Sequence, residues 1–217
     1  MLISYLTGLS VTARFDIKSF AALAAISLYV NSKQALTLWV RGTEQGRSKS
    51  LVLFIAQIAL ASALLAYLLG DAILKFLPYG ILPIIYISLT RLAGEHAMIS
   101  ELSGFVLLTS SVLVSRYIVS GDIDPRLYIA TAVFFTAGVF KVRVQLKKRT
   151  FERVSMGLYL IFALILYRVI RLPLIVLLPL LDDVIFAVTL YRVKLRAMGW
   201  IEVLKGIAFL VLMTFSY

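Results

Sequence analysis

The chain has 217 residues, of which 61% are hydrophobic and 15% charged, and its mean hydropathy is +0.97. A water-soluble domain is about 45–50% apolar and about 25% charged, so this composition excludes a soluble globular domain and predicts a membrane protein. The absence of Cys excludes disulfides, thiolate catalysis and iron–sulfur ligation. A single His, His96, excludes a histidine metal centre within this chain, and we expect no metal and no cofactor.

Apolar runs between charged clusters predict an all-α, polytopic transmembrane bundle of about eight helices, within a range of seven to nine, that forms one integral membrane domain over 1–217. The runs lie near 18–40, 50–70, 74–90, 97–119, 126–146, 152–168, 172–191 and 199–216. The first residues lack the positive region of a signal peptide. The single Asn and the absent Cys are typical of a thermophile's composition.

Lys and Arg in short loops predict the orientation in a cell membrane, because cytoplasmic loops carry an excess of positive charge. The loops at 41–49, 91–96, 141–153 and 192–196 hold more Lys and Arg than those on the other side. We therefore expect these four loops in the cytoplasm and both termini outside.

The net charge of +11 raises the question of a nucleic-acid partner. A nucleic-acid binder presents its basic residues on a polar folded surface, whereas here they separate hydrophobic runs, so we expect contact with anionic lipid headgroups and no nucleic acid. The candidate headgroup-binding or phosphate-binding residues are Lys141, Arg143, Lys147, Lys148 and Arg149.

Polar residues interrupt the first apolar run. Ser27, Asn31 and Gln34 lie at i, i+4 and i+7 and form one stripe on a helix. Such a stripe is typical either of hydrogen bonding between helices or of a cavity wall. Lys33 lies on a different face of the helix, and its long side chain can extend so that the ammonium reaches the membrane surface.

The fourth run carries Glu101, which needs a cation such as Lys33, Lys141 or Arg143, or else a proton, at its predicted depth. The same face carries Gly104 and small Ser residues, which predict close helix packing. Glu95 and His96 begin this run. A Glu in a first turn complements the helix dipole, so we interpret this pair as a cap, with His96 as a general base the alternative.

The seventh run combines Pro179 with Asp182 and Asp183. Acidic residues in a Pro-broken helix coordinate cations in some transporters, and pairing with Arg168 or Arg171 is the structural alternative that we prefer. In the last run, Glu202 and Lys205 are three positions apart and are expected to neutralise one another.

Three segments resemble the YwiC-like family of small integral membrane proteins: GEHAMISELSGF, VFKVRVQLKK with the following RTFERVSMGLY, and KLRAMGWIEVLKGIAF. The most specific positions are Glu95, Glu101, Arg143, Gly199 and Glu202. The chain lacks the family's first-helix Lys-Glu-His-Gly motif, and Tyr159-Leu160 stands in place of its Tyr-His pair. No biochemical function is attached to that family, so the resemblance implies kinship rather than an activity.

The layout is similar, more distantly, to UbiA-type prenyltransferases with one N-terminal helix fewer. Those enzymes hold Mg²⁺ and a diphosphate with Asp-rich motifs. Here the corresponding segment keeps Asn31 but has Ser32 and Ala35 at the acidic positions, and FKVRVQLKK contains no carboxylate. The resemblance therefore implies the fold without the metal-dependent chemistry.

These observations favour a non-enzymatic multi-pass membrane protein that binds a lipid or isoprenoid or serves as a subunit of a membrane assembly. Two alternatives stay open. One is a metal-independent lipid-modifying transferase that binds phosphate through Lys and Arg, and the other is a transporter of a small solute or ion.

Overall fold

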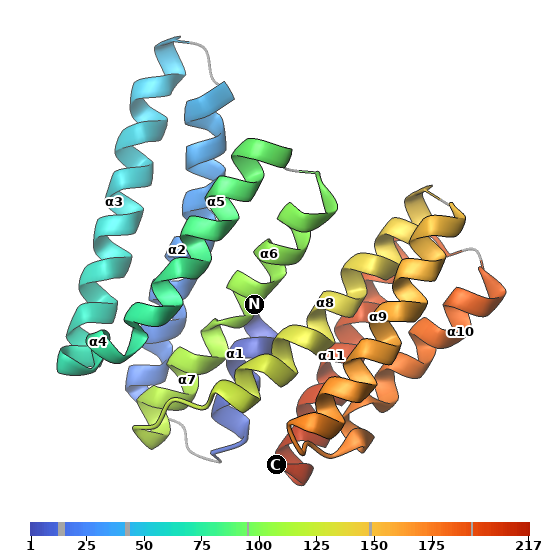
Figure 1. The fold of residues 1–217 in the computed structure, drawn as a ribbon. Coiled ribbons are helices and arrows are strands. Elements are labelled where there is room, and N and C mark those ends of the chain that lie inside the picture. The colour runs from blue at the N-terminus through green and yellow to red at the C-terminus, as the bar shows by residue number, and fades with distance from the viewer. Residues whose placement is uncertain (13–15, 42–43, 95, 148, 192) are drawn as a thin grey trace.

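The computed structural model describes residues 1–12, 16–41, 44–94, 96–147, 149–191 and 193–217. The regular secondary structure of these residues consists of helices alone (Figure 1). The first half contains α1 (Leu2–Ser10), α2 (Ile17–Arg41), α3 (Glu44–Leu69), η1 (Gly70–Ala72), α4 (Ile73–Phe76), η2 (Leu77–Gly80), α5 (Ile81–Ala93), α6 (Met98–Thr109) and α7 (Ser111–Ser120). The second half contains α8 (Pro125–Lys147), α9 (Thr150–Val169), η3 (Leu174–Leu180), α10 (Leu181–Thr189) and α11 (Leu195–Ser216).

Each of the eight predicted runs coincides with helical structure. Five are single helices, namely α2, α3, α8, α9 and α11. The predicted run at 74–90 includes a 3-10 turn before α5, and the other two are interrupted. The short helix α1 was not predicted, because nine residues are too few to produce a membrane-length apolar run.

Five helical stretches of the described chain are long and apolar enough to cross a membrane, which fits a multi-pass membrane protein. They are Ser48–Ala93, Met98–Ser120, Pro125–Lys147, Thr150–Val169 and Arg196–Ser216. Within the protein 78% of the α8 window is buried, against 6% of the window in Ser48–Ala93. Helix α8 is therefore the centre of the bundle, while the stretch from α3 to α5 presents an apolar surface suited to lipid.

The interruption of the 98–120 run has a local cause. Thr109 Oγ1 donates hydrogen bonds to the carbonyls of Phe105 (3.0 Å) and Val106 (2.9 Å), and Ser110 Oγ donates to the carbonyl of Leu107 (2.7 Å). Side chains that bond backbone carbonyls in this way compete with the helical ladder and bend helices. Helix α6 therefore ends at Thr109, and α7 begins at Ser111.

The seventh run is interrupted at Pro179, which lies inside the 3-10 segment η3. Proline has no N–H to donate, and its ring clashes with the preceding turn of an α-helix. Regular α-helix therefore begins only at Leu181, so that Asp182 and Asp183 fall in the first turn of α10.

Helix ends alternate between the two ends of the molecule (Figure 1). The junctions α2/α3, α5/α6, α8/α9 and α10/α11 lie at one end, which we call the basic end, and Tyr217 lies at the other. The exposed Lys and Arg at or near these four junctions are Lys49, Arg91, Lys147, Arg149, Lys194 and Arg196. The four loops predicted to share one side of the membrane thus share one end of the bundle.

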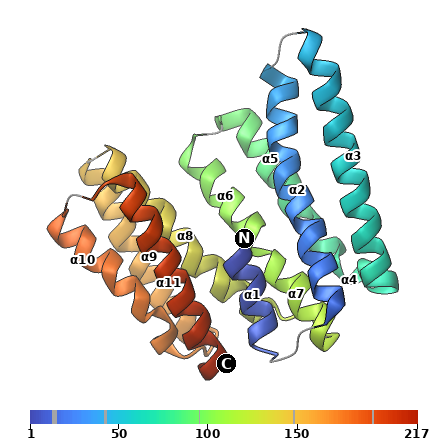
Figure 2. The same ribbon diagram turned by 180° about the vertical axis from the view of Figure 1, so that it is seen from behind.

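Helix α1 packs against both α7 and α11 (Figure 2). Tyr5 is buried, and its hydroxyl donates a hydrogen bond of 2.5 Å to the carbonyl of Ser19 at the start of α2. Gly8 faces α7 so closely that an added Cβ would lie 2.0 Å from Ser115 Oγ and 2.7 Å from the carbonyl oxygen of Val112. The small residues of the fourth run therefore serve helix packing at this point.

Replacing Gly8 with Ala tests this contact, because the backbone oxygen of Val112 cannot rotate away. We expect Gly8→Ala to lower the free energy of unfolding by about 1–3 kcal/mol through overpacking. The matched control is Gly157→Ala in α9, where an added Cβ has no neighbour within 4 Å and gains helix propensity instead. Unfolding midpoints of both variants in one detergent provide the measurement. Equal midpoints would contradict the close packing of α1 on α7.

Candidate functional site

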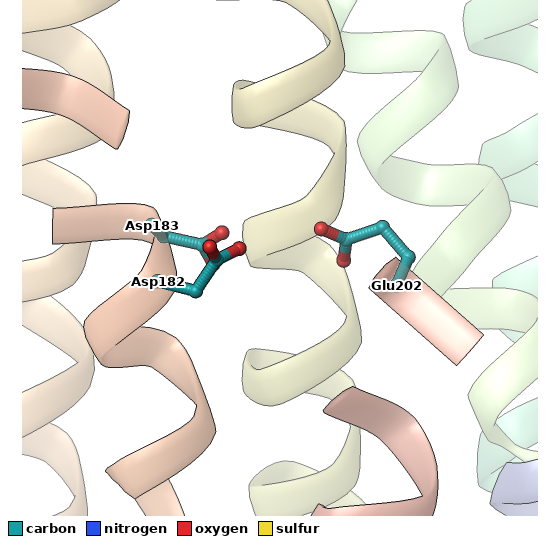
Figure 3. Close-up of side chains that lie close together, drawn as sticks. All are labelled: Asp182, Asp183 and Glu202. Carbon is teal, nitrogen blue, oxygen red and sulfur yellow. The ribbon is translucent and has the colours of Figure 1, made fainter. Parts of the chain in front are cut away.

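Five charged side chains meet inside the bundle and form what we call the charge cluster. They come from three elements, α8, α10 and α11, and Figure 3 shows the three carboxylates converging on one region. The members of the charge cluster are Lys141, Asp182, Asp183, Glu202 and Lys205.

Lys141 is the centre of the charge cluster, and its side chain is 0% exposed. Its Nζ donates a hydrogen bond to Asp182 Oδ2. The same Nζ lies 3.4 Å from Asp183 Oδ1 and 3.2 Å from Glu202 Oε1. A buried ammonium is stable only if carboxylates surround it, because removing it from water costs several kcal/mol.

The second cation of the charge cluster is Lys205. Its Nζ lies 2.5 Å from Asp183 Oδ1 and 2.9 Å from Glu202 Oε1. Tyr191 completes the surroundings, since its hydroxyl donates a hydrogen bond of 2.7 Å to Asp182 Oδ1. Both lysines therefore bridge α10 and α11, and Lys141 adds α8 to the same junction.

The charge cluster confirms one expected pairing and corrects another. Glu202 and Lys205 do contact one another within α11, as their spacing predicts. The expected pairing of Asp182 or Asp183 with Arg168 or Arg171 is wrong. Those arginines lie where α9 ends, at the opposite end of the bundle from the basic end, whereas the first turn of α10 faces Lys141.

The carboxylate of Glu202 lies close to Gly138 of α8. A Cβ added at Gly138 would lie 2.9 Å from Glu202 Oε2, closer than real contacts allow. This contact was not predicted from the sequence. Gly138 stands three residues before Lys141, and that helical spacing on one face was the available signal.

Carboxylate oxygens of Asp182, Asp183 and Glu202 lie within 4.8 Å of one another, a spacing at which three carboxylates can hold a metal ion. The space between them is already used, however, because the Nζ atoms of both lysines contact these oxygens. A divalent cation would have to sit beside two ammonium groups. The arrangement therefore does not fit a metal centre.

A second ion pair joins α8 to α6. Arg143 Nε donates to Glu101 Oε2 at 2.8 Å, and Arg143 Nη2 donates to the carbonyl of His96 at 2.6 Å. Of the three cations considered for Glu101, Arg143 is thus its partner. The ammonium of Lys33 lies 5.5 Å from the ring centre of Tyr86. His96 itself is exposed, and Glu95 lies outside the described residues.

The basic residues near 141–149 divide into two groups. Lys141 and Arg143 are buried and paired with carboxylates, so the structure does not present them to headgroups. Lys147 and Arg149 are exposed at the basic end, and Lys147 also lies 3.6 Å from Glu152 of α9. Lys148 lies outside the described residues.

The polar residues of the first run lie on the surface of the protein. Asn31, Lys33 and Gln34 are all exposed, and Asn31 and Gln34 make no hydrogen bond among the described residues. Ser32, between Asn31 and Lys33, is buried instead, and its hydroxyl donates a hydrogen bond of 2.8 Å to the carbonyl of Tyr29. Helix α2 thus presents two amides on its outer surface that have no hydrogen-bond partner within the described chain. On a soluble protein water would bond them, whereas lipid cannot.

Two adjoining concavities lie where α9 turns into η3, at the end opposite the basic end. The first, of about 490 Å³, is lined by Arg168, Arg171, Leu172 and Pro173. The second, of about 400 Å³, is lined by Leu164, Ile165, Arg168, Val169 and Leu174. Both are shallow and open, and Arg168 borders both, so basic surface adjoins apolar surface here.

No family model matches the chain, and neither a curated protein nor a solved structure is found to be similar to it. The site is therefore interpreted from its own geometry.

The Arg143 ion pair provides a test of the junction between α6 and α8. Arg143→Met leaves Glu101 without its cation and should lower the free energy of unfolding by about 1–3 kcal/mol. The double variant Arg143→Met with Glu101→Gln should recover part of this loss, because no unpaired charge remains. Arg149→Met is the exposed control and should stay within about 0.5 kcal/mol of wild type. Chemical denaturation measures all three, and equal effects of Arg143→Met and Arg149→Met would refute the pairing.

Proposed function

We propose that this chain is a non-enzymatic, multi-pass membrane protein that serves as a subunit of a membrane assembly, with α2 as its contact surface. The carrying observation is the exposed pair Asn31 and Gln34, which lack hydrogen bonds within the described chain. In the same proposal the basic end faces the cytoplasm, and the chain is related to the YwiC-like proteins with a UbiA-like arrangement.

The position of the two amides supports a protein partner. Helix α2 has 25 residues and is about 37 Å long at 1.5 Å per residue, and Asn31 lies near its middle. Helix α2 is not one of the five stretches of the described chain that are long and apolar enough to cross a membrane, and the proposal places it in the membrane beside them. There an amide has no water to bond, and polar side chains in membranes hydrogen-bond across helices instead. Asn31 and Gln34 share one face of α2. A neighbouring helix that bonds this face satisfies both.

A second copy of this chain is the simplest such partner. An amide side chain both donates and accepts hydrogen bonds, so the same side chain on an identical helix is complementary to it. A two-fold contact places one patch against itself, which is the commonest form of oligomer. The α2 face meets this condition of self-complementarity.

The interior of the bundle supports a role without catalysis. A transferase that binds phosphate through Lys141 and Arg143 needs these cations free, but each is paired with carboxylates. A transporter based on Asp182 and Asp183 needs acidic groups free for cargo, but Lys141 and Lys205 contact them. Both alternatives therefore have less support than the assembly role.

Native mass spectrometry of protein released directly from membrane vesicles tests the assembly role. Wild type should appear as a dimer, at twice its mass of 24.2 kDa, and Asn31→Leu with Gln34→Leu should release monomer. Val30→Leu changes an exposed apolar neighbour on the same helix and should keep the dimer. A monomeric wild type, or a double variant that stays dimeric, would refute the contact at α2.

Binding of an anionic lipid is a second candidate function, favoured by the two concavities beside α9. Arg168 and Arg171 offer two guanidinium groups to a phosphate, which Arg binds well. The shallow apolar surface beside Arg168 would contact an acyl or isoprenoid chain. Arg171 adopts a left-handed backbone with φ of 57°, which is uncommon for a residue with a Cβ. A lipid with one phosphate and one apolar chain matches this order of basic and apolar surface.

Retention of a prenyl monophosphate in nanodiscs tests the lipid site. The double variant Arg168→Gln with Arg171→Gln should lose most of the lipid that wild type retains, because both guanidinium groups are removed. Arg91→Gln with Arg196→Gln removes two exposed arginines at the basic end and should leave retention unchanged. Native mass spectrometry counts the bound lipid. Equal retention by the two double variants would show that net charge, and not this concavity, holds the lipid.

A further inference from the structure

The charge cluster contains an odd number of charges. Asp182, Asp183 and Glu202 contribute three negative charges when ionised, and Lys141 and Lys205 contribute two positive ones. The cluster then carries a net charge of −1 inside an apolar bundle. An uncompensated charge in this setting is costly, so the cluster favours the gain of one positive charge.

One buried oxygen atom of the cluster is free to take that charge. The side chain of Asp183 is 0% exposed, and its Oδ1 contacts both lysines. Its Oδ2 is buried and has no hydrogen-bond partner in the described part of the chain. A buried carboxylate oxygen without a donor is rare in folded proteins and requires an explanation. Figure 3 shows the Asp183 carboxylate directed toward the region that Glu202 also faces.

We infer that the charge cluster is a binding site for one proton, held on Asp183 Oδ2. A hydronium ion gives up the proton, so one of its O–H bonds breaks and water is left. The proton adds to a lone pair of Oδ2, one O–H bond forms, and the carboxylate becomes a carboxylic acid. The loaded cluster then has two negative and two positive charges and is neutral. This inference concerns the interior of the bundle and is independent of the assembly role of α2.

The surroundings favour a proton over a metal ion. Each ammonium already lies among the carboxylate oxygens, so space for a coordination shell is absent at those contacts. A proton needs no coordination shell, and the O–H group that it forms needs only one acceptor. A carboxylate oxygen of Glu202, on another helix, lies within 4.8 Å of one of Asp183.

The charge cluster also has an accessible side. The side chains of Asp182 and Glu202 are 32% and 28% exposed, whereas those of Asp183 and Lys141 are fully buried. Asp182 and Glu202 are therefore the most exposed members of the charge cluster.

The other polar groups around the site add no ion pair to it. Tyr191 donates its hydroxyl to Asp182 Oδ1, and Arg153 of α9 donates to the carbonyls of Ala187 and Val188 at the end of α10. Lys141 also lies 5.7 Å from the ring centre of Phe186. Within the described residues, the ion pairs of the cluster therefore join its own five members.

Infrared spectroscopy of the full chain in nanodiscs tests the site, because a carboxylic acid has a C=O band that a carboxylate lacks and that shifts in D₂O. Wild type should show one such group at neutral pH, and this group should be lost as the pH rises. Loss of the proton uncovers the net negative charge, so the unfolding midpoint should fall over the same pH range.

The number of acid groups should follow the charge count of each variant. Asp183→Asn leaves two carboxylates and two lysines and should show no carboxylic acid group. Its unfolding midpoint should not depend on pH over the range in which the wild-type group loses its proton. Lys205→Met leaves three carboxylates and one lysine and should show two. Glu101→Gln is the matched control, because its pair with Arg143 is balanced, and it should keep the single wild-type group.

Several outcomes would overturn the inference. One is a wild type without a carboxylic acid group at every pH at which it is folded. Another is a wild-type group that persists in Asp183→Asn. If Na⁺ at fixed pH raises the midpoint of wild type but not of Asp183→Asn, the site binds a metal cation instead. Should Asp183→Asn fail to fold, the wild-type spectrum and its pH titration decide the matter alone.

Discussion

The structure depends on two basic side chains that project from opposite sides of the central helix α8. Lys141 and Arg143 are two positions apart, and at about 100° per residue their side chains point to nearly opposite sides of the helix. Lys141 binds the acidic residues of α10 and α11, and Arg143 binds Glu101 of α6. A cation buried in an apolar bundle requires carboxylates in contact. These two requirements therefore fix how the helices on both sides of α8 are positioned along it.

Local backbone chemistry brings the acidic residues to Lys141. Pro179 prevents a continuous α-helix, so α10 begins at Leu181 and carries Asp182 and Asp183 in its first turn. The helix dipole stabilises negative charge at that position. Gly138 leaves room on α8 for the Glu202 carboxylate. A kink and a missing side chain, both features of the sequence, thus produce a junction of three helices. The same junction supplies the unbalanced charge from which the proton site is inferred.

The distribution of satisfied and unsatisfied polar groups connects this architecture to function. Inside the bundle, ammonium, guanidinium and carboxylate groups are bonded to one another, which supports a rigid scaffold more than a reactive centre. On the surface, the amides of Asn31 and Gln34 lack hydrogen bonds within the described chain, and Arg168 and Arg171 border a concavity. Binding to helices or lipids satisfies such groups in a membrane. The proposed roles therefore lie at the surface, and the proton site lies within.

The sequence by itself determined the all-helical class, the eight helical runs, the alternation of basic loops and the Glu202–Lys205 contact, because apolar periodicity and short spacings act locally. It did not determine which cation Glu101 binds, that Asn31 and Gln34 face outward, or that Asp182 binds Lys141. The Glu101–Arg143 and Lys141–Asp182 pairs span 42 and 41 residues. Only the tertiary structure decided these, because the rotation and depth of each helix are set by packing against its neighbours.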